Sequence, residues 1–107
     1  NLLHSSANIT GGGIIENIPR SIPNGYTANI DLSKIKVLEI FKWLKANNIS
    51  DMEMLRTFNC GIGFCLITDK KKEKKIRRFF DKKYQPYRIG YINKSPKKIN
   101  FIKKIKW

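Results

Sequence analysis

The spacing of apolar side chains divides the first half of the chain into helical and extended segments. Residues 14–18 predict a short helical turn that ends before Pro19, because the residue before a proline avoids the α region. A turn at residues 23–25 leads into a short strand over residues 26–31. From residue 32 to 47 the apolar residues recur at helical spacing, which predicts a helix with one wide apolar face. That face comprises Val37, Leu38, Ile40, Phe41 and Leu44.

A capping signal and a compact apolar run define the next two elements. Ser50 and Glu53 have the spacing of a capping box, so a helix should run from Ser50 to about Phe58. Residues 61–68 are largely apolar and have turn signals on both sides, which predicts a buried strand.

The C-terminal third predicts one basic helix and two strands. Asp69 can cap a helix over residues 70–84, and Lys and Arg surround its narrow apolar stripe. A solvated helix face is the first interpretation of such a charge run, and a phosphate-binding helix is the alternative. Residues 87–92 and 99–107 predict the final strands, although Lys103 falls on the apolar side of the second.

These elements favour a single α+β domain. Their order is helix, strand, helix, helix, strand, helix, strand, strand, which predicts a mixed β-sheet with helices packed on one face. A chain of 107 residues is long enough for one modest core. We find no internal repeat and no domain boundary.

The strong positive charge is the most unusual feature of the composition. The net charge of +14 would by itself suggest nucleic acid or another polyanion as a partner. However, 17 of the 22 basic residues are Lys, whereas bidentate readout of bases favours Arg. Lys, Ile and Asn together make up about two-fifths of the chain, a skew that indicates codon drift. We therefore expect no specific nucleic-acid partner.

Cysteine, histidine and hydropathy exclude several other classes. Two cysteines and one histidine are too few for a disulfide framework or a Cys/His zinc site. No apolar run approaches the roughly 18 residues that a membrane helix needs. We expect a cytoplasmic protein with no membrane partner and no metal ligands of its own. The absence of a starting Met suggests a piece of something longer.

Two segments carry candidate chemistry. Gly11, Gly12 and Gly13 open the first helical turn, where free backbone N–H groups can bind an anion such as phosphate. The second segment, residues 54–63, leads from a polar stretch into a strand with glycines on both sides of Ile62. Turns without any ligand are the alternative for both segments.

Four segments in order resemble the AIR synthetases, the phosphoribosylformylglycinamidine cyclo-ligases. The first two are NITGGGIIENIPRSIP, similar to HITGGGxxENIPRxLP, and DMEMLRTFNCGIGFCLI, similar to EMxRTFNCGxGM followed by an apolar strand. The other two are IDLSK…IFKWLKANNIS between them and YRIGYI after them. The resemblance covers essentially the whole chain and identifies it as part of the C-terminal domain, truncated at its N-terminal side.

The resemblance implies an ATP-dependent ligase of purine biosynthesis. In this family ATP phosphorylates the formamide oxygen of formylglycinamidine ribonucleotide, and an amidine nitrogen then closes the imidazole ring. ATP and Mg²⁺ are bound mainly by an N-terminal half that this chain does not contain. Because that half is missing here, we expect this fragment to be inactive alone. The complete enzymes are homodimers.

The resemblance also nominates site residues. It implies that Thr10, Gly11, Gly12 and Gly13 cradle the ribose phosphate of the substrate, and that Arg56, Thr57 and Asn59 face the cleft. Gly61 and Gly63 are expected to serve backbone geometry. The family motif has His where this chain has Asn8, which cannot shuttle a proton near neutral pH. No catalytic residue is therefore assigned.

Two other functions fit the sequence. One is a small Lys-rich nucleic-acid binder that uses residues 70–83 and the Lys-rich C-terminus. Its affinity should fall steeply with salt as phosphate contacts are screened. The other is an inactive remnant of the ligase, which Asn8 and the lysine drift would fit.

Overall fold

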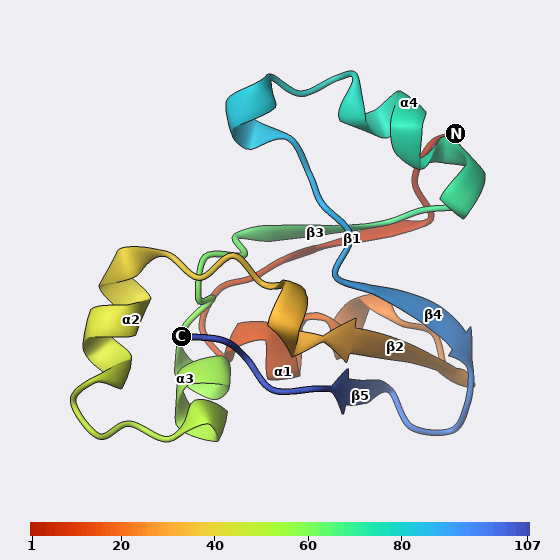
Figure 1. The fold of residues 1–107 in the computed structure, drawn as a ribbon. Coiled ribbons are helices and arrows are strands. Elements are labelled where there is room, and N and C mark those ends of the chain that lie inside the picture. The colour runs from red at the N-terminus through yellow and green to blue at the C-terminus, as the bar shows by residue number, and fades with distance from the viewer.

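A computed structural model describes residues 1–107, and it contains two separate sheets (Figure 1). The first pairs β1 (Ser5–Asn8) antiparallel with β3 (Phe64–Ile67). The second has the order β4-β2-β5, with β2 (Tyr26–Asp31) antiparallel to β4 (Gly90–Lys94) and parallel to β5 (Ile99–Ile102). A mixed sheet and an α+β fold are therefore confirmed, although the strands divide between two sheets instead of one.

Four short helices accompany the sheets. They are α1 (Gly13–Asn17), α2 (Glu39–Lys45), α3 (Asp51–Thr57) and α4 (Glu73–Arg77). Short 3-10 turns lie at Pro19–Ser21, Leu32–Lys34, Lys70–Lys72 and Lys82–Tyr84. None of these helices has the length and apolar character needed to cross a membrane.

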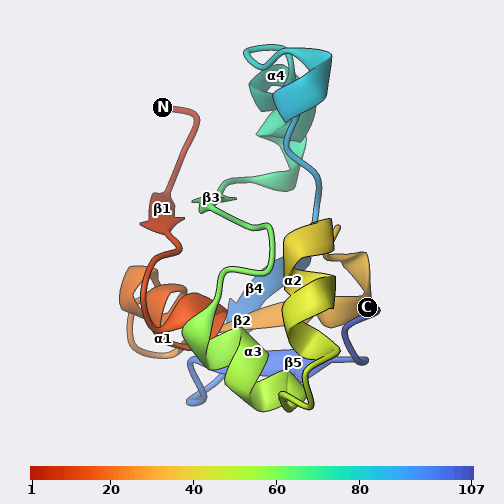
Figure 2. The same cartoon turned by 90° about the vertical axis from the view of Figure 1, so that its left-hand side faces the viewer.

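The core lies where α1 and α3 meet the three-stranded sheet. Ile14 of α1, together with Met54 and Leu55 of α3, belongs to the same buried cluster as Ala28 and Ile30 of β2. Figure 2 shows the two helices next to each other at the lower end of the molecule, with α4 at the opposite end beyond β1 and β3. The two motif-bearing helices thus form the best-packed part of the chain.

Local signals predicted three of these elements well. The strand over residues 26–31 is confirmed at both ends. The helix that begins after Ser50 is also confirmed, because the Ser50 hydroxyl oxygen accepts a hydrogen bond from the Glu53 N–H at 3.2 Å. The first helical turn forms and is followed by Pro19, as the proline requires.

The predicted helix over residues 32–47 is wrong in its first half. The Asp31 carboxylate accepts hydrogen bonds from the N–H and the hydroxyl of Ser33, at 3.0 and 2.6 Å, and so stabilises a 3-10 turn. Ile35 then enters the core with an extended backbone, and the helix begins only at Glu39. As a result Leu38 and Ile40, which the helical pattern places on the apolar face, are exposed.

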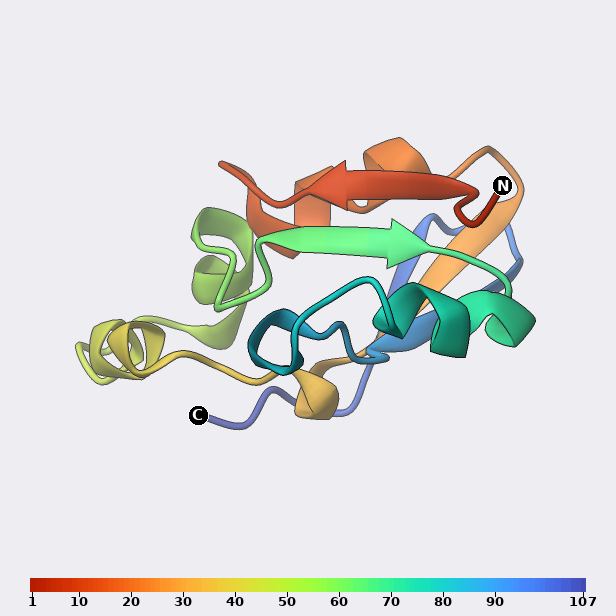
Figure 3. The same cartoon turned by 90° about the horizontal axis from the view of Figure 1, so that it is seen from above.

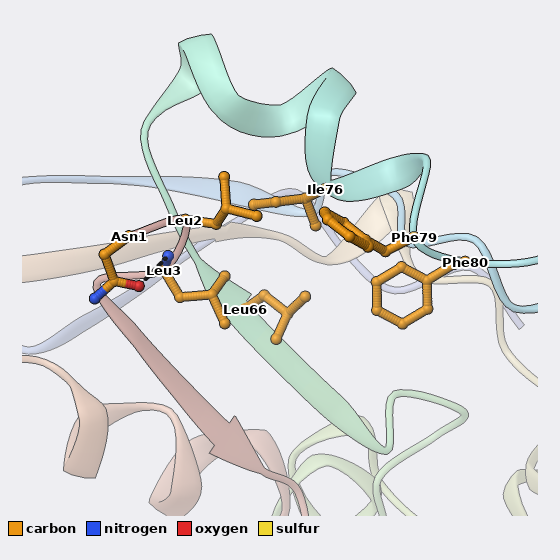
Figure 4. A pocket seen from close by; sticks show the side chains of 7 residues that line it. All are labelled: Asn1, Leu2, Leu3, Leu66, Ile76, Phe79 and Phe80. Carbon is orange, nitrogen blue, oxygen red and sulfur yellow. Dashed lines mark hydrogen bonds between the residues drawn. The ribbon is translucent and has the colours of Figure 1, made fainter.

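The predicted basic helix over residues 70–84 is also wrong, because only residues 73–77 are α-helical. Asp69 does not cap it: its carboxylate instead contacts the imidazole of His4 at 2.9 Å. Closely spaced lysines repel one another along a helix, and Ile76 is the only buried side chain of α4. Figure 4 shows Ile76 and its neighbours around a shallow apolar pocket on the surface. That pocket is lined by Asn1, Leu2, Leu3, Leu66, Ile76, Phe79 and Phe80.

The remaining strands differ in length from their predictions. The strand expected over residues 61–68 is only β3, and its residues are half-buried or exposed instead of buried. Figure 3 shows β3 beside β1, its single partner strand. The strand expected over residues 87–92 begins at Gly90. The last strand ends before Lys103, which adopts a positive φ of 59° and turns the chain. β1 was not predicted, because its segment Ser-Ser-Ala-Asn has a single apolar residue.

Candidate functional site

The fold brings the two motif segments against each other. The N–H of Ile9, just before the glycine loop, donates to the carbonyl oxygen of Gly63 at 2.9 Å. At the other end of the loop, Gly13 lies against the C-terminal end of α3. A Cβ atom added to Gly13 would lie 2.0 Å from the carbonyl oxygen of Leu55 and 3.0 Å from that of Phe58. Both contacts flank Arg56 and Thr57 in sequence.

The three glycines of the loop have different structural roles. Gly12 has φ 95°, and the side chain of Glu16 occupies the space that a Cβ would need. Gly13 has φ 61° and is buried against the backbone of α3. Gly11 is exposed, and a Cβ added there would meet nothing within 4 Å. Positive φ and steric crowding therefore explain why residues 12 and 13 are glycines. Neither applies at Gly11, so a side chain can be accommodated there.

Asn17, which the sequence analysis missed, organises this loop. Its side chain is only 6% exposed, and its amide nitrogen lies 3.2, 3.2 and 2.8 Å from the carbonyl oxygens of Thr10, Gly11 and Gly13. Asparagine is a poor helix former that competes for backbone hydrogen bonds. Its position at the end of a five-residue helix was the sequence signal that could have identified this role.

This arrangement leaves three backbone N–H groups unpaired on the other side of the loop. In a trans peptide the N–H points opposite to the C=O of the preceding residue. Because the carbonyls of Thr10, Gly11 and Gly13 turn toward Asn17, the N–H groups of Gly11, Gly12 and Ile14 point away from it. None of the three has an acceptor within the chain, whereas the Gly13 N–H donates to the Thr10 carbonyl oxygen at 3.0 Å. Ile14 is fully buried, so only Gly11 and Gly12 can present their N–H groups to a ligand. Adjacent free N–H groups of this kind can bind an anion.

Charged side chains beside the loop partly cancel. The Glu16 carboxylate lies over Gly12, and a negative group there would repel a bound anion. The Arg20 guanidinium lies 3.6 Å from that carboxylate and offsets its charge. Both side chains are exposed, so each is free to move when an anion approaches.

The residues nominated from the second motif are mostly occupied by local contacts. The Thr57 hydroxyl donates to Glu53 at 2.8 Å, and the Arg56 guanidinium lies 3.8 Å from the same carboxylate. The Asn59 side-chain oxygen accepts the N–H of Gly61 at 2.9 Å and so fixes the turn into β3. Gly61 has φ 111°, in keeping with a geometric role. Of the three candidates, Arg56 keeps a largely exposed charge.

The widest groove of the molecule lies elsewhere. It runs between the two sheets and along the segment that leads into β4, and none of the seven nominated residues lines it. A phosphate-binding turn presents N–H groups at the surface and does not require a large groove. The position of the loop outside the groove is therefore compatible with phosphate binding. Asn8, at the end of β1, is exposed and pairs with Phe64.

Cysteine and metal chemistry are not supported by the residues present. Burial raises the pKa of both Cys60 and Cys65 to about 11, so the thiols stay protonated near neutral pH and are poor nucleophiles. No group of three or more His, Cys, Asp or Glu side chains is placed to hold a metal ion.

Comparison with known proteins gives the family. A phosphoribosylformylglycinamidine cyclo-ligase of Geotalea daltonii is 51% identical over 75 residues, which cover 69% of this chain and 22% of the relative. The protein of that name from Synechococcus is 42% identical over 92 residues, or 84% and 27% of the two chains. The trifunctional purine biosynthetic protein adenosine-3 of Gallus gallus is 42% identical over 87 residues, or 80% and 9%.

The chain thus spans about a quarter of the length of these cyclo-ligases and about a tenth of the trifunctional protein. The family model described as AIR synthase related protein, C-terminal domain, matches residues 1–103. The family match is independent of the loop geometry, and it includes both motif segments. The chain therefore belongs to the AIR synthase related proteins, as part of their C-terminal domain.

Proposed function

We propose that this chain is part of an ATP-dependent cyclo-ligase that converts formylglycinamidine ribonucleotide to aminoimidazole ribonucleotide in purine biosynthesis. Support comes from the family match and from the names of the relatives, which include two purine-pathway proteins of different size. We further propose that ATP and Mg²⁺ bind mainly outside this segment, in a longer cytoplasmic homodimer. ATP would supply the phosphoryl group that activates the formamide oxygen.

Within that enzyme, the task we assign to this chain is binding the ribose phosphate of the substrate. The observation that carries this assignment is the pair of free N–H groups at Gly11 and Gly12. A phosphate oxygen can accept several such N–H bonds at once, and charge-assisted bonds are stronger than neutral ones. Arg20 and Arg56 carry positive charge near the loop, although each lies within 3.6–3.8 Å of a carboxylate, Glu16 and Glu53 respectively.

Asn8 restricts what the chain does chemically. A carboxamide donates and accepts hydrogen bonds but does not exchange protons near neutral pH. Asn8 therefore does not serve as a general base, and its carboxamide at most orients the substrate.

A matched pair of variants at Gly11 tests the phosphate assignment. Gly11→Asp places a carboxylate in open space beside the free N–H groups, and Gly11→Asn adds a side chain of the same shape without the charge. The assay uses a chimera in which this chain replaces the segment that it matches in the Geotalea daltonii cyclo-ligase. We expect Gly11→Asp to raise the KM for formylglycinamidine ribonucleotide at least about tenfold, or about 1.4 kcal/mol. Gly11→Asn should change it less than about threefold.

The comparison separates charge from shape. Equal KM values for the two variants would contradict phosphate binding at this loop, whatever their absolute size. A loss of folding is not expected for either variant, because Gly11 has neither a positive φ nor a neighbour within 4 Å of the added Cβ.

A second candidate function is binding of a polyanion by residues 70–84. This segment has nine Lys and Arg residues against two acidic ones, and Phe79 and Tyr84 within it are 71% and 68% exposed. Exposed aromatic rings beside basic residues suit single-stranded nucleic acid. Such binding should decline steeply with salt, whereas the cyclo-ligase assignment predicts only weak binding without sequence preference.

A further inference from the structure

Asn17 is a buried polar side chain whose contacts all go to one loop. Its amide has two N–H hydrogens, but three carbonyl oxygens lie within 3.2 Å of the nitrogen, so at least one hydrogen is shared. The three carbonyls belong to Thr10, Gly11 and Gly13, which span the glycine loop. Among the four residues from Thr10 to Gly13, three therefore have their carbonyl oxygen in contact with this one side chain.

Glycine loops do not hold such an orientation by themselves. A glycine peptide can rotate at little steric cost, because the residue lacks a Cβ. If the peptide groups that follow Thr10 and Gly11 rotated by half a turn, their carbonyl oxygens would face outward in place of the N–H groups. Oxygen atoms carry partial negative charge, so the rotated loop would repel an anion.

We propose that Asn17 is a positioning residue that holds the glycine loop in its phosphate-binding orientation. This inference rests on the proposed function of the loop. Asn17 does not touch the substrate, because it lies on the opposite side of the peptide groups from the free N–H groups. Its effect is exerted through the directions of the peptide groups after Thr10, Gly11 and Gly13.

The chemistry of the side chain explains why asparagine suits this position. The site needs a short side chain that donates more than one hydrogen bond without carrying a charge. Aspartate has the same shape but, when ionised, has no hydrogen to donate and would face three carbonyl oxygens. Alanine would remove every one of these contacts and leave the carbonyls free to turn.

The chain offers a matched control in Asn29. This residue is also 6% exposed, lies in β2, and bonds through its amide to Asn93 at 2.9 Å and to Asn100 at 3.1 Å. Asn29→Ala thus removes an equally buried amide from a different part of the molecule. It accounts for any general loss of stability.

The test compares Asn17→Ala with Asn29→Ala in the chimeric cyclo-ligase. We expect Asn17→Ala to raise the KM for formylglycinamidine ribonucleotide at least tenfold while changing kcat less than threefold. Asn29→Ala should leave the KM within threefold of the parent, even if its melting temperature falls. Equal KM values for the parent and Asn17→Ala, or equal increases for both variants, would overturn the proposal.

A second measurement separates this proposal from the phosphate assignment itself. In the 107-residue chain, the backbone N–H residual dipolar couplings of residues 11–14 report the orientation of the peptide groups without any ligand. These couplings should change in Asn17→Ala and not in Asn29→Ala, and unchanged couplings in Asn17→Ala would refute positioning. If they change while the two Gly11 variants have equal KM values, positioning stands and the phosphate role fails.

Discussion

Replacing Gly13 by alanine should destabilise the chain by about 3–5 kcal/mol, close to the largest effects seen for single substitutions. Two costs combine at this position. An L-residue with a side chain loses about 1–2 kcal/mol in the left-handed region, and Gly13 has φ 61°. In addition, the new Cβ would lie 2.0 Å from the carbonyl oxygen of Leu55, so α1 and α3 would have to separate.

The control for this prediction is Gly11→Ala in the same loop. Gly11 has no positive φ and no atom within 4 Å of the added Cβ, so its free energy of unfolding should change by less than about 0.5 kcal/mol. Urea unfolding of both variants, followed by circular dichroism, measures the difference. Similar stabilities for Gly13→Ala and Gly11→Ala would mean that α1 does not pack on α3 as described.

Truncating Met54 to alanine should lower the free energy of unfolding by about 3 kcal/mol. Met54 is fully buried and joins α3 to the cluster that includes Ile14 and Ala28. Its removal leaves a cavity as well as losing buried apolar surface, and such changes cost about 2–5 kcal/mol.

Met52 provides the matched comparison on the same helix. It lies two residues away on α3 and is 49% exposed, so Met52→Ala should change stability by less than about 0.5 kcal/mol. Thermal and urea unfolding of the two variants give the values. If Met52→Ala were as damaging as Met54→Ala, the buried face of α3 would be wrongly assigned.

Elements specified by local signals were predictable from the sequence. The strand over residues 26–31 follows a Pro-Asn-Gly turn. The start of α3 depends on the Ser50 hydroxyl, which accepts the N–H of Glu53 three residues later. Both signals act within a few residues. Neither depends on how distant parts of the chain pack.

Elements that depend on distant partners were not predictable in the same way. Helical periodicity over residues 32–47 could not reveal that Ile35 enters the core as extended chain. The residues of β1 become a strand because they pair with β3, almost 60 residues later. The narrow apolar stripe of residues 70–84 finds a buried place only for Ile76, so most of the predicted helix does not form.

The candidate site likewise has one part that local signals predict and another that depends on the folded structure. The glycine loop was visible in the sequence, because three adjacent glycines before a helix are a local pattern. The part played by Asn17 requires knowledge of where three carbonyl oxygens point, which no spacing rule supplies. Asn59 was nominated for the cleft, and the hydrogen bond that its side-chain oxygen accepts from Gly61 also depends on the folded turn.

The most direct test of the central proposal is ATP-dependent ring closure by the chimera that carries this chain in the Geotalea daltonii cyclo-ligase. The reaction is followed by ADP release and by formation of aminoimidazole ribonucleotide. If the chain is a working part of such an enzyme, with Asn8 tolerated, the chimera forms both products in equal amounts. A chimera that folds and binds ATP but closes no ring would contradict the proposal and favour an inactive remnant.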